Sequence, residues 1–260
     1  PMIVGLSGCA QKSTDTTSTK QAKEAQATPT STPFQYYASV DDEPRTISGK
    51  CGDNAEWSYN TGTKVLTISG SGAVDRAVDS DTSKQKIEGL AEPYEVKERI
   101  TCSVKEIKIE EGITALAVSN LFGNVSKDED AEEIKLSLPD SLERINANTF
   151  APTTDAAYIR TIHLPRNVRY IEGGAFWGLG ATDTSDTFNE NLTITVDSKN
   201  PYYMTENNVL FTKDKKTLVY YPVEKTEQSY RIPKSVTKVE ALAFSRNPFL
   251  KKVVLPTGIT

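Results

Sequence analysis

A short apolar motif recurs at fixed offsets along the second half of the chain, and it constrains the fold more than any other feature. Each copy opens on an apolar residue before a proline, and further apolar residues follow 4, 7 and 12 positions later. Because a repeat of this length is one supersecondary unit, we expect an array of stacked coils. The complete copies are Leu138, Leu142, Ile145 and Phe150; Leu164, Val168, Ile171 and Phe176; and Ile232, Val236, Val239 and Phe244.

Two less complete copies extend the array. The earlier copy offers two candidates for its aromatic position, Leu121 and Phe122. The chain stops inside the later copy, so we interpret the sequence as a fragment of a longer protein. The apolar residues are Ile109, Ile113 and Leu116 in the earlier copy, and Leu255 and Ile259 in the later one.

The spacing of the prolines indicates the length of one coil. Pro139 and Pro165 are 26 residues apart, and Pro233 and Pro256 are 23 apart. Both lie in the range of about 20–29 residues that leucine-rich repeats show. The 68 residues between Pro165 and Pro233 are too many for one coil. We expect a further coil there, with a strand over 194–196 and an insertion after it.

A short alternating run precedes each motif and predicts a strand. Its outer residues face the core and its middle residue faces solvent, while the following proline ends the strand because it lacks the amide donor. Stacking should bury Leu138, Leu164, Ile232 and Leu255 in one column, with Phe150, Phe176 and Phe244 buried opposite. The runs are Ile107-Lys108-Ile109, Leu136-Ser137-Leu138, Ile162-His163-Leu164 and Val253-Val254-Leu255.

These motifs resemble the BspA-like leucine-rich repeats of bacterial surface proteins. The pattern Leu-Pro-x-x-Val-x-x-Ile-x-x-x-Ala-Phe fits residues 164–176, and residues 197–230 are similar to the family's interrupting hairpin. Residues 49–72, with Trp57, are similar to the segment that often opens these arrays. The resemblance covers about 46–260 and implies a mainly β fold with irregular coils, a leucine-rich-repeat solenoid preceded by a small β-rich cap region. Polar insertions over 151–158 and 177–190 depart from the pattern.

The N-terminal part predicts export rather than folding. Leu6-Ser7-Gly8-Cys9 resembles the lipobox of bacterial lipoproteins, in which the cysteine carries a diacylglyceryl anchor. We assign 1–9 to a signal-peptide remnant and 10–45 to a disordered Ser/Thr-rich tether. Residues 46–103 form the cap region, and 104–260 form the solenoid with its hairpin near 197–230. The predicted location is the extracellular face of the bacterial cell envelope, with the anchor at Cys9 as the sole membrane contact.

The sequence predicts no enzyme. His163 is the single histidine, so it cannot complete a usual catalytic or zinc site, and we expect no catalytic residue, cofactor or metal ligand. The acidic run over 128–133 lacks the alternation and glycine of a calcium loop. A net charge of −5 argues against nucleic acid. Cys51 and Cys102 are left as either a disulfide or two small buried residues.

These observations favour a binding module for an unknown extracellular protein or glycan, of the adhesion type that the resemblance implies. The alternative is the targeting arm of a larger secreted enzyme whose catalytic domain lies beyond residue 260. On the strand face, Lys108, His163 and Arg231 are the candidate ligand contacts. The hairpin from Tyr202 to Tyr221 is an equal candidate, because its tyrosines can either stack on sugars or pack in the core. The full strand file is Lys108, Ser137, His163, Thr195, Arg231 and Val254.

Overall fold

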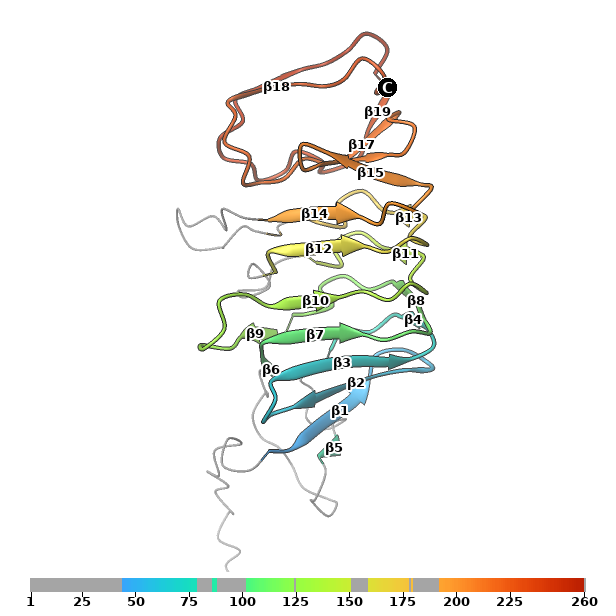
Figure 1. The fold of residues 1–260 in the computed structure, drawn as a ribbon, viewed down its shortest axis with the longest axis vertical. Helices are drawn as coiled ribbons and strands as arrows, with labels where there is room; N and C mark the ends of the chain where they lie inside the picture. Colours follow the sequence, from blue (N-terminus) through green and yellow to red (C-terminus); the bar gives the residue numbers. More distant parts are fainter. Residues whose placement is uncertain are drawn as a thin grey trace, which may run out of the picture. The chain divides into compact units, whose positions relative to one another are not determined.

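The computed structural model describes residues 44–78, 86–87, 102–123, 125–150, 159–177, 179 and 192–259 (Figure 1). The chain divides into two units, Pro1–Tyr37 and Ala38–Thr260, and all described residues lie in the second. Cys9 with its lipobox, residues 10–43 of the tether, the insertion 151–158 and most of the insertion 177–190 lie outside the described residues. Within the described part, no helix has the length and apolar character needed to cross a bilayer.

One row of strands follows the alternating runs of the sequence. The first sheet has six strands in the order β10-β7-β3-β2-β1-β5: four are antiparallel, β5, β1, β2 and β3, and β7 and β10 then add in parallel. The same row continues as the parallel pair β12 and β14 (Figure 1). Their bounds are β1 Thr46–Lys50, β2 Ala55–Asn60, β3 Val65–Gly70, β5 Lys86–Ile87, β7 Glu106–Ile109, β10 Lys135–Ser137, β12 Thr161–Leu164 and β14 Thr193–Val196. The strand expected over 194–196 is therefore confirmed.

A second row of short strands was not predicted from the sequence. It forms a parallel sheet in the order β13-β11-β8-β4, and β11 and β13 each begin five residues after a repeat proline, Pro139 and Pro165. Each coil thus contributes two short strands, joined by turns that reverse the chain. The bounds are β4 Gly72–Val74, β8 Ile113–Leu116, β11 Arg144–Ile145 and β13 Tyr170–Ile171. A further parallel pair links β6 Cys102–Val104 to β9 Val125–Lys127.

The insertion adds a three-stranded antiparallel meander between two coils. Its last strand pairs in parallel with β19 of the next coil, so the insertion is continuous with the array. The final coils contribute the parallel pair β18 and β20. The bounds are β15 Tyr203–Glu206, β16 Val209–Thr212, β17 Thr217–Tyr220, β18 Ser229–Arg231, β19 Lys238–Val239 and β20 Lys252–Val254.

An aromatic column runs through the coils and decides the open question at Leu121 and Phe122. The ring centroids of Phe122 and Phe150 are 6.1 Å apart, and those of Phe150 and Phe176 are 5.8 Å apart. Phe122 therefore occupies the aromatic position, one residue later than in the other copies. Leu121 takes the core position that Ala175 holds in a later coil. The predicted burial of Phe150 and Phe176 is confirmed.

The turn before each aromatic residue has a left-handed backbone. The residue two positions ahead of the aromatic has φ of 62° at Asn120, 56° at Asn148, 81° at Gly174 and 59° at Leu242. Asparagine and glycine tolerate this conformation, whereas leucine does not. The turns stack by backbone hydrogen bonds, from Asn120 N to Asn148 O at 2.8 Å and from Asn148 N to Gly174 O at 3.1 Å. The strained Leu242 is therefore imposed by its place in the array.

The predicted column of strand-end residues is only partly correct. Leu164 and Ile232 are fully buried, but Leu138 is half-buried and Leu255 is 59% exposed. Leu255 follows β20, and no described strand pairs with the outer edge of β20 to cover it. Phe244, expected to be buried, is half-buried and packs against a second, smaller cluster that contains Tyr221 and Ile232.

Candidate ligand-binding surfaces

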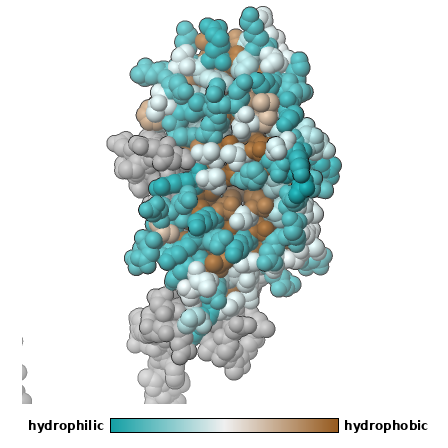
Figure 2. All heavy atoms as spheres, in the orientation of Figure 1, coloured by the Kyte–Doolittle hydropathy of each residue, from teal (hydrophilic) through white to brown (hydrophobic). Residues whose placement is uncertain are grey.

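The strand face carries exposed side chains in register. Lys108 pairs with Thr67 on one side and with Ser137 on the other, while His163 pairs with Thr195. The last two are joined by a contact of 2.9 Å between His163 Nδ1 and Thr195 Oγ1. Figure 2, in the orientation of Figure 1, shows mostly hydrophilic atoms with bands of hydrophobic surface between them. The face can present hydrogen-bonding groups at regular intervals.

Arg231 does not continue this face by strand pairing. It lies on β18, which pairs only with β20 among the described strands, where Arg231 is opposite Val254. The meander β15–β17 lies between β14 and β18 along the chain and in the stack (Figure 1). The sequence predicts Lys108, His163 and Arg231 in a single file, but the structure places them in three separate sheets. The sheets of Lys108 and His163 follow one another in the row of Figure 1, and that of Arg231 lies beyond the meander.

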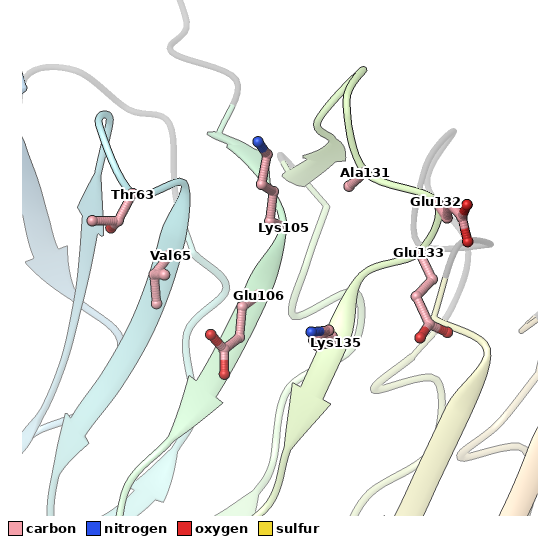
Figure 3. A pocket seen from close by; sticks show the side chains of 8 residues that line it. All are labelled: Thr63, Val65, Lys105, Glu106, Ala131, Glu132, Glu133 and Lys135. Atoms are coloured by element: carbon pink, nitrogen blue, oxygen red, sulfur yellow. The ribbon is translucent and has the colours of Figure 1, made fainter.

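A hollow of about 320 Å³ opens at the beginning of β3, β7 and β10 (Figure 3). Glu106 and Lys135 line it from β7 and β10, and Lys105 lines it from the bend before β7. Glu132 and Glu133 line it from the loop before β10. Charges of both signs alternate around it. No sequence motif predicts this hollow, because it depends on which strand ends lie side by side.

The acidic run beside this hollow is structural. Asp128 is 5% exposed, and its carboxylate accepts hydrogen bonds from Asp130 N at 3.2 Å and Ser103 Oγ at 3.3 Å. Burial opposes ionisation, but the Asp130 amide and the Lys105 ammonium, 3.5 Å away, lower the pKa of Asp128 overall. Among the described residues, no group of three or more acidic, histidine or cysteine side chains could hold a metal ion.

A second hollow, of about 510 Å³, lies against the meander. Its lining residues are Pro201, Tyr202, Thr212, Lys213, Asp214 and Thr217. Tyr202 is 46% exposed, whereas Trp57, Tyr203, Tyr220 and Tyr221 are all buried. Of the aromatic residues considered for stacking on sugars, those four pack in the core and Tyr202 alone presents its ring to solvent.

The two cysteines of the folded part are free thiols in this structure. Cys51 and Cys102 are both buried, and no bond joins them. Burial raises the pKa of each thiol to about 12, so neither is reactive as a thiolate near neutral pH. The structure thus shows them as small core residues.

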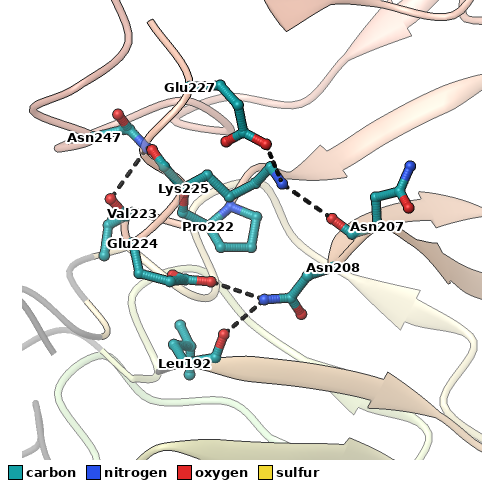
Figure 4. A network of polar contacts seen from close by, with 9 residues as sticks. All are labelled: Leu192, Asn207, Asn208, Pro222, Val223, Glu224, Lys225, Glu227 and Asn247. Atoms are coloured by element: carbon teal, nitrogen blue, oxygen red, sulfur yellow. Dashed lines mark hydrogen bonds and ion pairs between the residues drawn. The ribbon is translucent and has the colours of Figure 1, made fainter. Parts of the chain in front are cut away.

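A buried carboxyl lies where the meander meets the preceding coil (Figure 4). Glu224 Oε1 accepts a hydrogen bond of 2.8 Å from Asn208 Nδ2, while its Oε2 is buried without a hydrogen-bond partner. Asn208 also donates to Leu192 O at 2.7 Å and accepts from Ile194 N at 2.9 Å. Burial raises the pKa of Glu224 to about 7. No sequence motif marked this residue, because its environment comes from distant segments.

Residues 129–198 match the model of the BspA type leucine-rich repeat region, which describes six copies. The fold of the described residues is a leucine-rich-repeat solenoid. No curated protein matches the chain.

Three solved structures are similar to this chain. One is a leucine-rich repeat protein from Eubacterium ventriosum, with 22% identity, a TM-score of 0.44, and coverage of 83% of this chain and 61% of that one. Another is the pneumococcal vaccine antigen PcpA, with 18% identity, a TM-score of 0.39, and coverage of 81% and 65%. A leucine-rich cell surface protein from Faecalibacterium prausnitzii has 17% identity, a TM-score of 0.39, and coverage of 81% and 71%. The chain thus spans less than two thirds of the length of the first two.

Proposed function

We propose that this protein is a non-catalytic binding module, displayed on the outer surface of a bacterial cell, that holds an extracellular protein or glycan on its strand face. The observation that carries the proposal is that exposed side chains lie in register across neighbouring strands. They do so across β3, β7 and β10, and again across β12 and β14. The BspA type repeat match over 129–198 supports the same class of function.

The strand face suits recognition because it is already ordered. Its backbone is held by ladder hydrogen bonds, and its core side is packed with fully buried residues such as Ile107 and Ile162. A surface that is rigid before binding loses little conformational entropy when a ligand docks. Lys108 supplies a cation 3.5 Å from Glu106, and His163 and Thr195 supply a paired ring nitrogen and hydroxyl.

A binding screen with the full chain tests this function. The probes are an array of neutral and acidic glycans and a panel of purified extracellular matrix proteins. For any protein or acidic glycan that binds, a variant with Lys108, His163 and Arg231 changed to alanine should weaken affinity by about tenfold or more. A control with Lys199 and Lys234, two exposed lysines off the strands, changed to alanine should bind like the wild type. Absence of binding to every probe would contradict the proposal.

The location of Arg231 in a separate sheet sharpens the same experiment. A double variant, Lys108→Ala with His163→Ala, tests the row of strands from β7 to β14, and Arg231→Ala alone tests the final coils. If the double variant loses as much affinity as the triple variant, the ligand lies on the row of strands from β7 to β14. If only Arg231→Ala weakens binding, the site lies beyond the meander.

Surface display through Cys9 is the second part of the proposal. It rests on Leu6-Ser7-Gly8-Cys9 followed by the Ser/Thr-rich tether. With a complete signal sequence added, the wild type should partition with membranes and Cys9→Ser should be released or left unprocessed. Equal membrane partitioning of the two forms would refute the anchor and leave the binding role untouched.

A further inference from the structure

We propose that the hollow at Tyr202 is a sugar-binding site that takes a neutral hexose unit of a glycan. This site deepens the proposed binding function and rests on it. Tyr202 is the one aromatic residue of the meander region whose ring is substantially exposed, at 46%. It forms part of the wall of a hollow whose volume, about 510 Å³, falls in the range of about 300–1,000 Å³ for small-molecule sites.

The backbone that carries Tyr202 is held in place by a buried asparagine. Asn200 is 1% exposed, and its Oδ1 accepts hydrogen bonds from Tyr202 N at 2.8 Å and Tyr203 N at 2.9 Å. Its Nδ2 donates to Pro165 O at 2.8 Å and Val168 O at 3.0 Å in the preceding coil. The aromatic wall is thus fixed to the solenoid before any ligand arrives, which lowers the entropic cost of binding.

The polar wall of the hollow is equally ordered. Asp214 Oδ1 accepts hydrogen bonds from Thr212 Oγ1 at 2.7 Å and from Lys216 N at 3.0 Å. The Thr212 hydroxyl and the Lys216 amide lower the pKa of Asp214, so this carboxylate stays ionised. A further backbone bond of 2.7 Å, from Lys213 N to Tyr202 O, ties the polar wall to the aromatic one.

These groups leave free hydrogen-bonding capacity. The second carboxylate oxygen of Asp214 accepts no hydrogen bond in the described structure, and the exposed Lys213 ammonium forms no ion pair with the described residues. The hollow therefore presents a ring face, a charged acceptor and a charged donor together. A hexose matches this set, because its C–H face packs on a tyrosine ring and adjacent hydroxyls donate to a carboxylate and accept from an ammonium.

Charge and size favour a neutral sugar over other ligands. The Lys213 ammonium and the Asp214 carboxylate offset each other, so the hollow has no net positive charge that would favour an anionic sugar or phosphate. A folded protein partner usually buries about 800 Å² on each side, far more than a hollow walled by six residues provides. If a protein binds at the Tyr202 hollow instead of a sugar, the experiment below contradicts the inference.

The experiment uses the full chain and two glycan sets: neutral oligosaccharides of glucose, galactose and mannose, and their sialylated or sulfated counterparts. At least one neutral oligosaccharide should bind in titration calorimetry, and its anionic counterparts should bind no more tightly. Tyr202→Ala should reduce affinity by about tenfold or more, and Tyr202→Phe should retain most of it because the stacking face remains. Asp214→Asn, which keeps the acceptor for Thr212 and removes the charge, should also reduce affinity.

Tyr170→Ala is the matched control, because Tyr170 is exposed to a similar degree, 44%, but lies on β13 under the Arg144 guanidinium, 4.3 Å from the ring centroid. It should bind like the wild type, and unchanged melting curves should show that every variant is folded. If a glycan or protein binds the chain and Tyr202→Ala retains full affinity, this site is refuted while the binding function stands. If only matrix proteins bind, the sugar assignment is refuted. Absence of any ligand refutes both.

Discussion

The regular coils over 109–176 and the segment over 203–254 fill their cores with aromatic residues in different ways. In the regular coils, each turn adds one phenylalanine to a column of Phe122, Phe150 and Phe176. In the later segment, the meander supplies Tyr220, whose ring lies 5.5 Å from Phe176, and then Tyr221, whose ring lies 5.1 Å from Phe244. The single column ends there, and a second cluster begins.

The difference shows what an insertion costs a repeat array. The rings of the Phe column bury only carbon, although Asn148 Oδ1 and Arg160 Nε elsewhere in the regular coils are buried without hydrogen-bond partners. In the meander, the Tyr220 and Tyr221 hydroxyls and the second Glu224 oxygen are buried without partners. A buried polar group without a partner costs about 1–3 kcal/mol. Leu242 adds strain at a left-handed turn. The array therefore keeps its geometry through the meander but loses local stability, and three measurements test this comparison.

Truncating the column should have the largest effect. Phe176 is 2% exposed, so Phe176→Ala should lower the free energy of unfolding by about 3–5 kcal/mol. Phe244 is half-buried, so Phe244→Ala should cost less, about 1–2 kcal/mol. Urea unfolding curves of the two variants measure both losses. Equal losses would mean that the two clusters are equally well packed and that the comparison is wrong.

The buried Glu224 carboxyl should make the junction sensitive to pH. Burial raises its pKa from 4.5 to about 7, so the folded state binds a proton that the unfolded state has already released between these values. The stability associated with Glu224 is present below about pH 4.5 and is lost as pH rises to about 7. After discounting for its partial exposure, we expect a loss of about 1–2 kcal/mol.

Glu224→Gln isolates this effect, because the amide keeps an acceptor for Asn208 and does not ionise. Melting temperatures of the wild type and the variant between pH 4.5 and 7.5 should converge at the acidic end and diverge as pH rises. Arg166 lowers the pKa of Asp140, and Thr212 lowers the pKa of Asp214. The stability that these two carboxylates contribute is therefore lost only at lower pH, outside this window. Parallel profiles for the two proteins would rule out a titrating Glu224 in this window.

Relieving the strained turn should have the smallest effect. Leu242 has φ of 59° and is 49% exposed, so Leu242→Asn removes strain without opening a cavity in the core. It should stabilise the protein by about 0.5–1 kcal/mol, and the reciprocal Asn148→Leu should destabilise it by a similar amount. Thermal unfolding checks both signs. A destabilised Leu242→Asn would show that the leucine side chain contributes packing that outweighs the strain.

The repeat architecture was readable from the sequence because it depends on local spacing. The offsets of 4, 7 and 12 placed Phe150 and Phe176 correctly, and the alternating run at 194–196 identified β14. Each of these positions is set by neighbours within one coil and repeated by its stacking partners. The exposed residues of the strand face, including Lys108 and His163, followed from the same alternation.

The remaining features depend on segments that are distant in sequence. Counting strands predicts Arg231 in one file with Lys108 and His163, but the three residues lie in three sheets, and the meander separates Arg231 from the other two. An alternating sequence pattern is local, so it does not indicate how far an insertion displaces the next coil. The coil that ends at Phe122 has one residue more than the other coils before its aromatic position. Spacing alone therefore does not distinguish Phe122 from Leu121, and the contact of the Phe122 ring with Phe150 decides between them.

The sequence by itself determined the coil, its length and the faces of its strands, since hydrophobic periodicity acts over a few residues. Only the tertiary structure decided which tyrosine of the meander stays exposed and which carboxyl is buried. Tyr202 and Tyr203 are adjacent in sequence, yet Asn200 turns the chain so that one ring faces solvent and the hydroxyl of the other accepts a hydrogen bond from Ile171 N at 2.9 Å. Burial is a property of what packs around a residue, and here those neighbours come from other coils.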